Sequence, residues 1–224
     1  MQNTFALLRG WSALIVMLCC VTSCDLPVQP KFEFESEIGE LVTFEDQTVL
    51  EWMSSPASVV TNNNANFDIM VRAIELTGLE EEYNDPSDRR TFFMLNNEAF
   101  TANNRIFRAL DVTALDSLDA TGIERLRNIL RYHIIDDYVD QGPENLPVLL
   151  TNYTFQSLVP GPEGEIIVHR DERFRMFINK RPLVNQLAIG LPSVARRTDV
   201  RNHNYVFSNG VGHQLRNYAR NVPF

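Results

Sequence analysis

Cysteine is scarce in this sequence. Its 224 residues contain three cysteines, Cys19, Cys20 and Cys24, and none follows position 24. The body of the chain therefore has no cysteine pair for a disulfide and no thiol for nucleophilic catalysis. A domain without disulfides depends on its hydrophobic core, and a chain of this length is long enough to form one such domain.

Basic residues are also fewer than acidic residues. Lysine and arginine number 20 against 29 aspartates and glutamates, which gives a formal net charge of −9. An acidic surface repels nucleic acid and anionic lipid, so we expect neither as a partner. The sequence also lacks a glycine-rich phosphate loop and a nucleophile elbow, which removes two common classes of enzyme.

The N-terminus has the pattern of a secretory signal. Arg9 precedes an apolar run over 11–21 that is too short for a permanent membrane span. The run leads into Val-Thr-Ser-Cys, which resembles the bacterial lipobox and implies that Cys24 becomes a lipidated N-terminus. We expect a lipoprotein signal peptide over 1–23. An ordinary signal peptide with an incidental cysteine is the alternative.

A tether and one domain are expected after the signal. The stretch 24–46 contains two prolines and an acidic alternating segment without helical periodicity, so it predicts a tether, with an edge strand as an added possibility. The domain is expected over 47–224. Multiple acyl chains, including palmitate, would anchor the protein without a basic patch, because each buried methylene contributes about 0.8 kcal/mol.

The first half of this domain has the patterns of helices. Thr48 and Glu51 have the spacing of a capping box, ahead of a short apolar helix that Pro56 would end. The next helix would begin at the candidate cap Asn66 and stop at Gly78.

Residues 91–100 read Thr-Phe-Phe-Met-Leu-Asn-Asn-Glu-Ala-Phe, which predicts a buried strand leading directly into a helix capped by Asn96 or Asn97. Thr121 and Glu124 form a second candidate capping box. The helix that follows them carries an apolar stripe that extends to His133 and Ile134.

The second half has the patterns of antiparallel strands. After Pro143 the helical periodicity gives way to short apolar runs between glycine, proline and asparagine. The expected strands cover 153–158, 165–169, 173–178, 183–187 and 204–207. Arginines alternate with apolar residues in 173–178, which predicts one wet face, and Asn209-Gly210 predicts a sharp turn with positive φ. Helices followed by strands indicate an α+β domain.

Three motifs in order resemble those of fasciclin domains: residues 91–100, Tyr132-His133 at a helix end, and the stretch 209–213, Asn-Gly-Val-Gly-His. Their spacing agrees over 66–219. The residues that match the family motifs are Thr91, Asn97, Ala99, Phe100, Tyr132, His133, Asn209, Gly210 and His213. The chain departs from the family pattern at three positions. These are Leu95, Asn96 and Arg216, where proline, threonine and aspartate are usual.

The resemblance implies a fold, a role and a location. The fold would be a single α+β fasciclin-like wedge of mixed strands with helices packed over one end. The role would be adhesion or protein docking without catalysis, cofactor or metal. Together with the lipobox, the resemblance implies a protein anchored at the outer membrane or cell surface of a Gram-negative bacterium. The partners would be the membrane, through Cys24, and an envelope or extracellular protein or glycan. The family's receptor-binding role for Tyr132 and His133 is not expected here, because helical phase places His133 inward.

Two other functions remain open, each tied to a set of residues. A glycan-binding accessory protein of a nutrient-uptake system would need exposed strand aromatics. The candidates are Tyr153, Phe155, Phe174, Phe177, Tyr205 and Phe207. A hydrolase would need a histidine and a carboxylate within reach in one pocket. The candidates are His133 and His213 with Asp136, Asp137 or Asp199. Core packing is the competing interpretation of the aromatics and of both histidines.

Smaller features complete the set of candidates. The four histidines lack the short spacing of a zinc site. The pair Asp136-Asp137 would be a solvated face or a weak cation site, and the arginines at 196, 197 and 201 would receive an acidic partner or lie in a solvated loop. Ser117, in Asp-Ser-Leu, resembles an O-glycan acceptor of some Gram-negative bacteria.

Overall fold

The computed structural model describes residues 43–61, 67–102, 105–173, 175–179 and 198–220. All of them belong to one compact unit, 40–224. The signal peptide, Cys24 and most of the expected tether lie outside the described residues. No helix among the described residues is long and apolar enough to cross a membrane.

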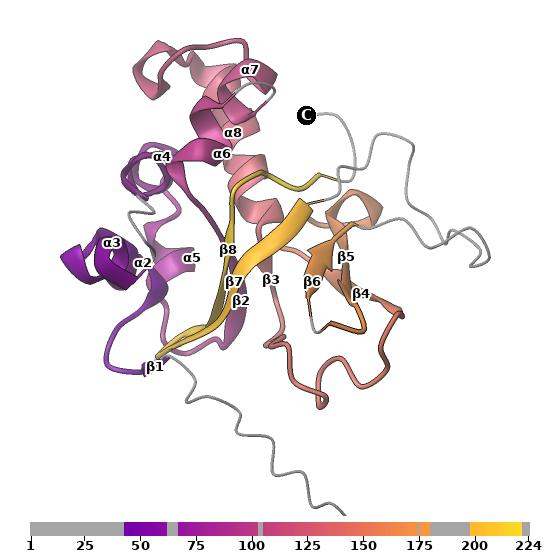
Figure 1. Ribbon diagram of the computed structural model, residues 1–224. Coiled ribbons are helices and arrows are strands. Elements are labelled where there is room, and N and C mark those ends of the chain that lie inside the picture. Colours follow the sequence, from indigo (N-terminus) through magenta and orange to yellow (C-terminus); the bar gives the residue numbers. More distant parts are fainter. Residues whose placement is uncertain (1–42, 62–66, 103–104, 174, 180–197, 221–224) are drawn as a thin grey trace, which may run out of the picture. The chain divides into compact units, whose positions relative to one another are not determined.

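Short helices occupy most of the first half of this unit (Figure 1). They are α2 (Val49–Ser54), α3 (Pro56–Thr61), α4 (Asp68–Thr77), α5 (Glu80–Asn84), α6 (Asn97–Thr101), α7 (Ile106–Ala109) and α8 (Ala120–Tyr132), with 3-10 turns η1 (Leu115–Ser117) and η2 (Pro162–Gly164). The capping box of α2 is confirmed, because the Glu51 amide donates to Thr48 Oγ1 and Glu51 Oε2 accepts from the Thr48 amide. Pro56 is predicted to end α2. It is instead the first residue of α3, a position at which a backbone N–H has no partner within the helix, so the missing N–H of proline costs nothing.

The ends of α4 and α8 test the helix predictions. Gly78 ends α4 in the left-handed conformation, at φ 65°, as predicted. The predicted capping box of α8 is wrong, because the helix begins before Thr121: Asp119 is the cap, and its Oδ1 accepts the Gly122 amide at 2.7 Å. The helix stops at Tyr132, so Ile134 lies in a strand and not on the helical stripe. The candidate cap Asn66 lies outside the described residues.

The strands form one mixed sheet. They are β1 (Thr43–Phe44), β2 (Arg90–Leu95), β3 (Ile134–Ile135), β4 (Asn152–Gln156), β5 (Glu165–Arg170), β6 (Met176–Ile178), β7 (Thr198–Phe207) and β8 (Gly210–Leu215). Their order is β3-β2-β8-β7-β6-β5-β4, and β1 pairs in parallel with β7. The predicted α+β class is confirmed.

The two edges of this sheet meet. Ile135 of β3 bridges Ser157 just after β4, and the Leu158 amide donates to the Ile134 carbonyl at 3.0 Å. The Asp136 amide adds a bond to the Gln156 carbonyl at 3.2 Å. These bonds nearly close the sheet into a barrel, which leaves fewer open strand edges.

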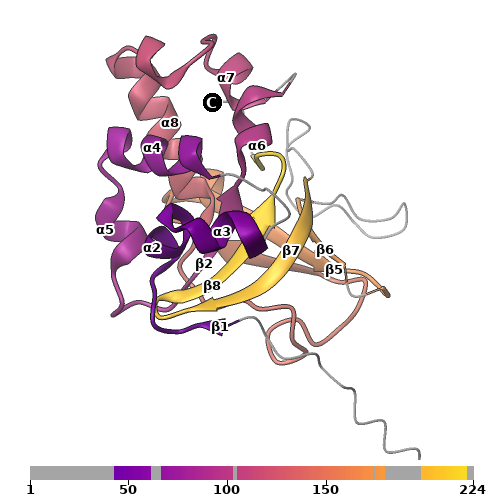
Figure 2. The ribbon, with the colours of Figure 1, turned by 60° about the vertical axis from the view of Figure 1, so that its left-hand side comes forward.

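Buried strands, and not alternating ones, dominate the sheet. In β2 every residue after Arg90 is buried, because helices cover one side of the sheet and the barrel interior takes the other. Figure 2 shows α2, α4 and α5 on the side of β2 and β8 away from β5 and β6. In the predicted strand 173–178, Arg173 and Arg175 are exposed as predicted, but the wet face does not extend into β6, because Phe177 is buried against the His169 ring and below the Arg175 guanidinium. The expected strand 183–187 lies outside the described residues.

An aromatic cluster joins the helices to the sheet. Trp52 of α2 lies 5.4 Å from the ring centroids of Phe44, Tyr205 and Phe207, and 5.7 Å from that of Phe67. Aromatic pairs at these separations add to the free energy of burial itself. Phe44 belongs to β1, so the end of the stretch 24–46 lies in the sheet.

Phe100 provides a test of the strand-to-helix packing. Its side chain is fully buried and its ring lies 5.9 Å from that of Phe107. We expect Phe100→Ala to lower the free energy of unfolding by about 3–5 kcal/mol, because it leaves a cavity in the core. Urea unfolding measures this loss, and Val148→Ala, on a side chain that is 57% exposed, is the control. Wild-type unfolding of Phe100→Ala would show that this packing is wrong.

Gly210 provides a second test, because its backbone approaches β2 closely. Its φ is 144°, and a Cβ at this position would lie 1.9 Å from the Arg90 carbonyl oxygen. Gly78 also has positive φ, but a Cβ there would have no neighbour within 4 Å. We expect Gly78→Ala to cost about 1–2 kcal/mol and Gly210→Ala more than about 3 kcal/mol. Equal losses in thermal melts would contradict the role assigned to the close approach.

Candidate functional site

His133, of the second motif, is fully buried at the C-terminal end of α8. Its Nδ1 lies 2.7 Å from the Ile129 carbonyl oxygen, and its Nε2 accepts the Ala219 amide at 2.9 Å. A carbonyl requires a donor and an amide requires an acceptor, so the ring is neutral with its proton on Nδ1. The ring therefore connects the last turn of α8 to the segment after β8.

His213, of the third motif, is fully buried in β8. Its Nε2 lies 2.9 Å from the Val139 carbonyl oxygen, and its Nδ1 accepts the Asn204 amide at 3.2 Å. The ring is therefore neutral with its proton on Nε2, which is the opposite tautomer to that of His133. It holds the loop after β3 against the β7–β8 hairpin.

Burial lowers the pKa of both histidines to about 4. The cause is desolvation of the charged ring. Protonation would also place a proton on the nitrogen that now accepts a hydrogen bond, so that two N–H groups would face each other. Neither ring has a nitrogen left for a substrate. The hydrolase interpretation of His133 and His213 therefore finds no support in this geometry.

Thr91, of the first motif, continues the contact that His213 makes. Its hydroxyl donates to the Asp137 carbonyl at 2.6 Å and accepts the Val139 amide at 2.7 Å. Asn204 accepts the Gln141 amide at 2.9 Å with Oδ1. Asn204 can do this because it lies at φ 62°, where the β7–β8 register shifts by one residue. The loop after β3 is thus fixed from both sides.

Asn209 of the third motif is fully buried and connects three elements. Its Oδ1 accepts the Val49 amide at the start of α2 at 3.0 Å, and its Nδ2 donates to the Tyr83 carbonyl of α5 at 2.8 Å. Its own carbonyl accepts the Arg90 amide of β2. Asn209 does not have the positive φ predicted for it; only Gly210 of this pair does.

The two asparagines of the first motif cap two different helices. Asn96 caps α6 by accepting the Ala99 amide at 3.3 Å. Asn97 instead accepts the Ile69 amide at 3.1 Å, in the first turn of α4, which has no side-chain cap of its own. Ala99 and Phe100 follow as fully buried residues.

Tyr132 is buried and is fixed by its hydroxyl group. The hydroxyl donates to the Glu165 carbonyl at 2.8 Å and accepts from Asn179 Nδ2 at 3.0 Å. Burial raises the pKa of Tyr132, so the hydroxyl stays protonated. The Tyr132 and His133 side chains both point inward, so this motif offers no surface for a receptor.

The nitrogens of both histidine rings bond backbone groups and not the candidate carboxylates. Asp136 forms an ion pair with Arg90 at 3.0 Å and is exposed, and Asp137 is engaged through its backbone carbonyl. Both directly follow β3 and are exposed, as a solvated face would be. Among the described residues no group of histidine, cysteine and carboxylate side chains could hold a metal ion.

The candidate aromatics do not form an exposed platform. Phe177, Tyr205 and Phe207 are buried, while Tyr153 and Phe155 are half-buried against the core. Phe174 lies outside the described residues. The large hydrophobic side chains that are exposed among the described residues are the aliphatic Val148 and Leu150. Ser117 is exposed in η1, and its glycosylation stays a prediction.

An arginine pocket of about 330 Å³ opens where β7 begins and β8 ends. Its lining residues are Arg105, Thr198, Asp199, Arg201, Arg216 and Asn217. Of the predicted basic cluster, Arg201 lines this pocket, and the arginines at 196 and 197 lie outside the described residues. Sequence reasoning missed Arg105, which is distant in the chain. Arg216 had a signal, because it stands where an aspartate is usual.

The two buried histidines predict a dependence of stability on pH. Each folded pKa of about 4 is below the ordinary 6.5, so the unfolded chain binds more protons between these values. The stabilisation is complete above pH 6.5 and is lost as the pH falls toward 4. At pH 5 we expect a loss of about 2 kcal/mol for each histidine relative to pH 7.5.

Urea unfolding at pH 7.5 and pH 5.0 measures this loss, at values where most carboxylates remain ionised. His203→Gln is the comparison variant: this histidine makes neither set of buried contacts, but burial lowers its pKa too and its charge lowers that of His213, so a minor part of the loss should disappear and most should persist. Equal unfolding free energies at the two pH values would contradict the neutral, buried state of the rings.

Comparison with known proteins identifies the family. A family model of the fasciclin domain matches residues 65–218. A search of curated proteins found no match. Among solved structures, a FAS1 domain pair from the insect cell adhesion molecule fasciclin I is similar, with a TM-score of 0.46 and 12% identity over 78% of this chain. The match covers 51% of that domain pair, so this chain spans about half its length. Because the family model covers more than half of the sequence, this protein belongs to the fasciclin domain family.

Proposed function

We propose that this protein is held at the cell envelope by a lipid on Cys24 and uses its fasciclin domain to dock another surface component. The observation that carries the docking role is the fasciclin domain itself, which matches residues 65–218. Fasciclin domains are generally non-enzymatic adhesion domains. The buried, fully bonded state of His133 and His213 agrees with such a role, since neither ring is left for acid–base chemistry.

The location of the anchor supports a surface role. Val-Thr-Ser-Cys at 21–24 resembles a lipobox, and β1 begins at Thr43, so the anchor and the domain are separated by a short stretch of chain. An extended chain spans at most about 3.3–3.6 Å per residue, which sets a limit on how far the domain stands from the lipid. A docking domain on a short tether acts close to its own membrane, which favours a partner at the same or an opposing surface. Gram-negative outer-membrane placement belongs to this proposal.

The anchor is tested by labelling intact cells of the source bacterium with radioactive palmitate. We expect label on the wild-type protein and no label on Cys24→Ala, because the lipid is attached to this sulfur. Cys20→Ala is the matched control, since Cys20 lies in the leader and should not affect labelling. Label that survives Cys24→Ala would contradict the anchor.

The docking role needs its own readout. Protease shaving of intact cells reports whether the domain is exposed, and attachment of cells to a surface coated with envelope extract reports adhesion. We expect protease to remove the domain from intact cells and thereby to abolish their attachment. We expect Cys24→Ala to release the protein from the cells, which would also abolish attachment. Attachment that is unchanged in a strain without the protein would argue against docking.

A further inference from the structure

The arginine pocket is built from segments far apart in sequence. Arg105 precedes α7, Arg201 lies in β7, and Arg216 follows β8. The Arg105 guanidinium donates to the Arg216 carbonyl, which fixes Arg105 at the pocket. The Thr198 hydroxyl donates to the Asn217 carbonyl at 3.4 Å and joins the two strand ends. Folding, and not local sequence, brings these cations together.

The backbone presents Arg201 outward. Val200 pairs with Leu215 and Asn202 pairs with Gln214, so β7 has one more residue than β8 between these pairs. Arg201 is this extra residue, and a bulge of this kind redirects the side chain that it carries. Val200 and Leu215 point inward to the core, and the neighbouring Arg201 and Arg216 are exposed.

The charge of this pocket is opposite to that of the chain. Its described lining residues carry three guanidinium groups and one carboxylate, that of Asp199, in a protein of formal net charge −9. Glu98 approaches Arg216 at 3.8 Å, but both side chains are at least half exposed, so the ion pair is weak. Clustered guanidinium groups repel one another, and a bound anion would remove that cost.

The lining also narrows the class of ligand. Planar guanidinium groups match carboxylates through paired hydrogen bonds. Among the described residues, the lining has no aromatic or aliphatic side chain, so this part of it offers no surface on which a sugar ring would stack. A peptide segment with acidic side chains supplies carboxylates of this kind without a sugar ring.

We propose that this pocket binds an acidic peptide segment of the docking partner, with carboxylates held by Arg201 and Arg216. The inference rests on the proposed docking function and names the chemical class of its partner. Arg105, fixed by the Arg216 carbonyl, adds the third positive charge. The rest of the acidic surface repels the same segment, which confines it to this pocket.

Binding of a fluorescein-labelled hexaglutamate peptide to the detergent-solubilised mature protein tests this proposal. We expect the double variant Arg201→Gln/Arg216→Gln to raise the dissociation constant about tenfold or more, since each charged hydrogen bond contributes appreciably. Added salt should weaken wild-type binding, because these charges are exposed to solvent. Arg201→Gln alone is a milder variant that leaves the pair of Arg216 and Glu98 in place.

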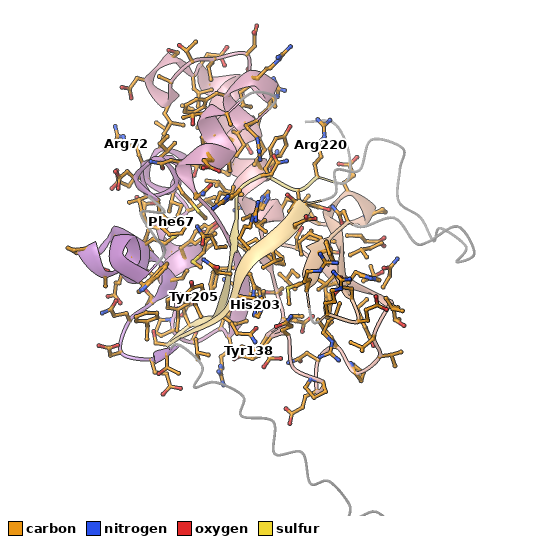
Figure 3. The ribbon with its side chains drawn as sticks, viewed as in Figure 1. Phe67, Arg72, Tyr138, His203, Tyr205 and Arg220 are labelled. Atoms are coloured by element: carbon orange, nitrogen blue, oxygen red, sulfur yellow. The ribbon has the colours of Figure 1, made fainter. Side chains whose placement is uncertain are left out.

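Arg72→Gln is the matched control. Arg72 is an exposed arginine on α4 that pairs with Glu75. Figure 3 shows it well apart from Arg220, which follows the pocket residue Asn217 by three positions. Binding should be unchanged in this variant, and circular dichroism should show that all variants are folded.

Three outcomes would overturn the proposal. They are no measurable binding of hexaglutamate to the wild type, equal loss in the Arg72→Gln control, and tighter binding of an oligogalacturonate than of hexaglutamate. The last outcome would assign the pocket to an acidic glycan.

The cell attachment assay separates this proposal from the docking function. Attachment that persists in the double variant would leave docking in place and remove the pocket from it. Peptide binding to the pocket without any attachment of cells would keep the pocket as a peptide site and argue against the docking function.

Discussion

A polar group buried away from water must find a hydrogen-bond partner inside the protein, and this requirement determines how the helices and strands of this domain are joined. Thr91, His133, Asn209 and His213 are all buried, and each connects backbone groups of segments that are distant in sequence. Removal of one partner would leave the other desolvated and unpaired, which costs more than the bond itself contributes. The motif side chains therefore hold distant segments of the fold together.

These side-chain hydrogen bonds explain why a sheet with short, irregular strands can nearly close. β3 has two residues and pairs with the long β2 on one side and with the end of β4 on the other. The loop that follows it places Val139 and Leu146 in the core. Thr91, His213 and Asn204 hold the same loop through the hydrogen bonds described above, so polar contacts add to these apolar contacts in fixing it.

Local chemistry was predictable from the sequence, and contacts between distant segments were not. The capping box of Thr48, the stop at Gly78 and the strand-to-helix step at 91–100 depend on neighbours a few residues away, and all three are confirmed. The cap of α8 was missed because Thr121 and Asp119 both offer a side-chain oxygen, and only the backbone decides between them. The burial of Phe177 was missed because its cover comes from His169 and Arg175 after folding. The sequence left the cap of α6 to Asn96 or Asn97; Asn96 takes it, and Asn97 bonds to α4, a contact that no local pattern indicates.

The same division separates family membership from partner choice. The polar side chains that identify a fasciclin domain in this chain have used their hydrogen-bonding groups on the fold, and all of them except Asn97 are buried, so they have none left for a ligand. The partner must then be selected by side chains that face solvent, and those side chains are free to differ without loss of the fold. Arg201 and Arg216 are of this kind: one is placed by a bulge, the other stands where the family pattern has the opposite charge, and neither is needed to close the sheet. In a protein of formal net charge −9, the proposed arginine pocket would let a change of two or three arginines decide which partner the domain admits.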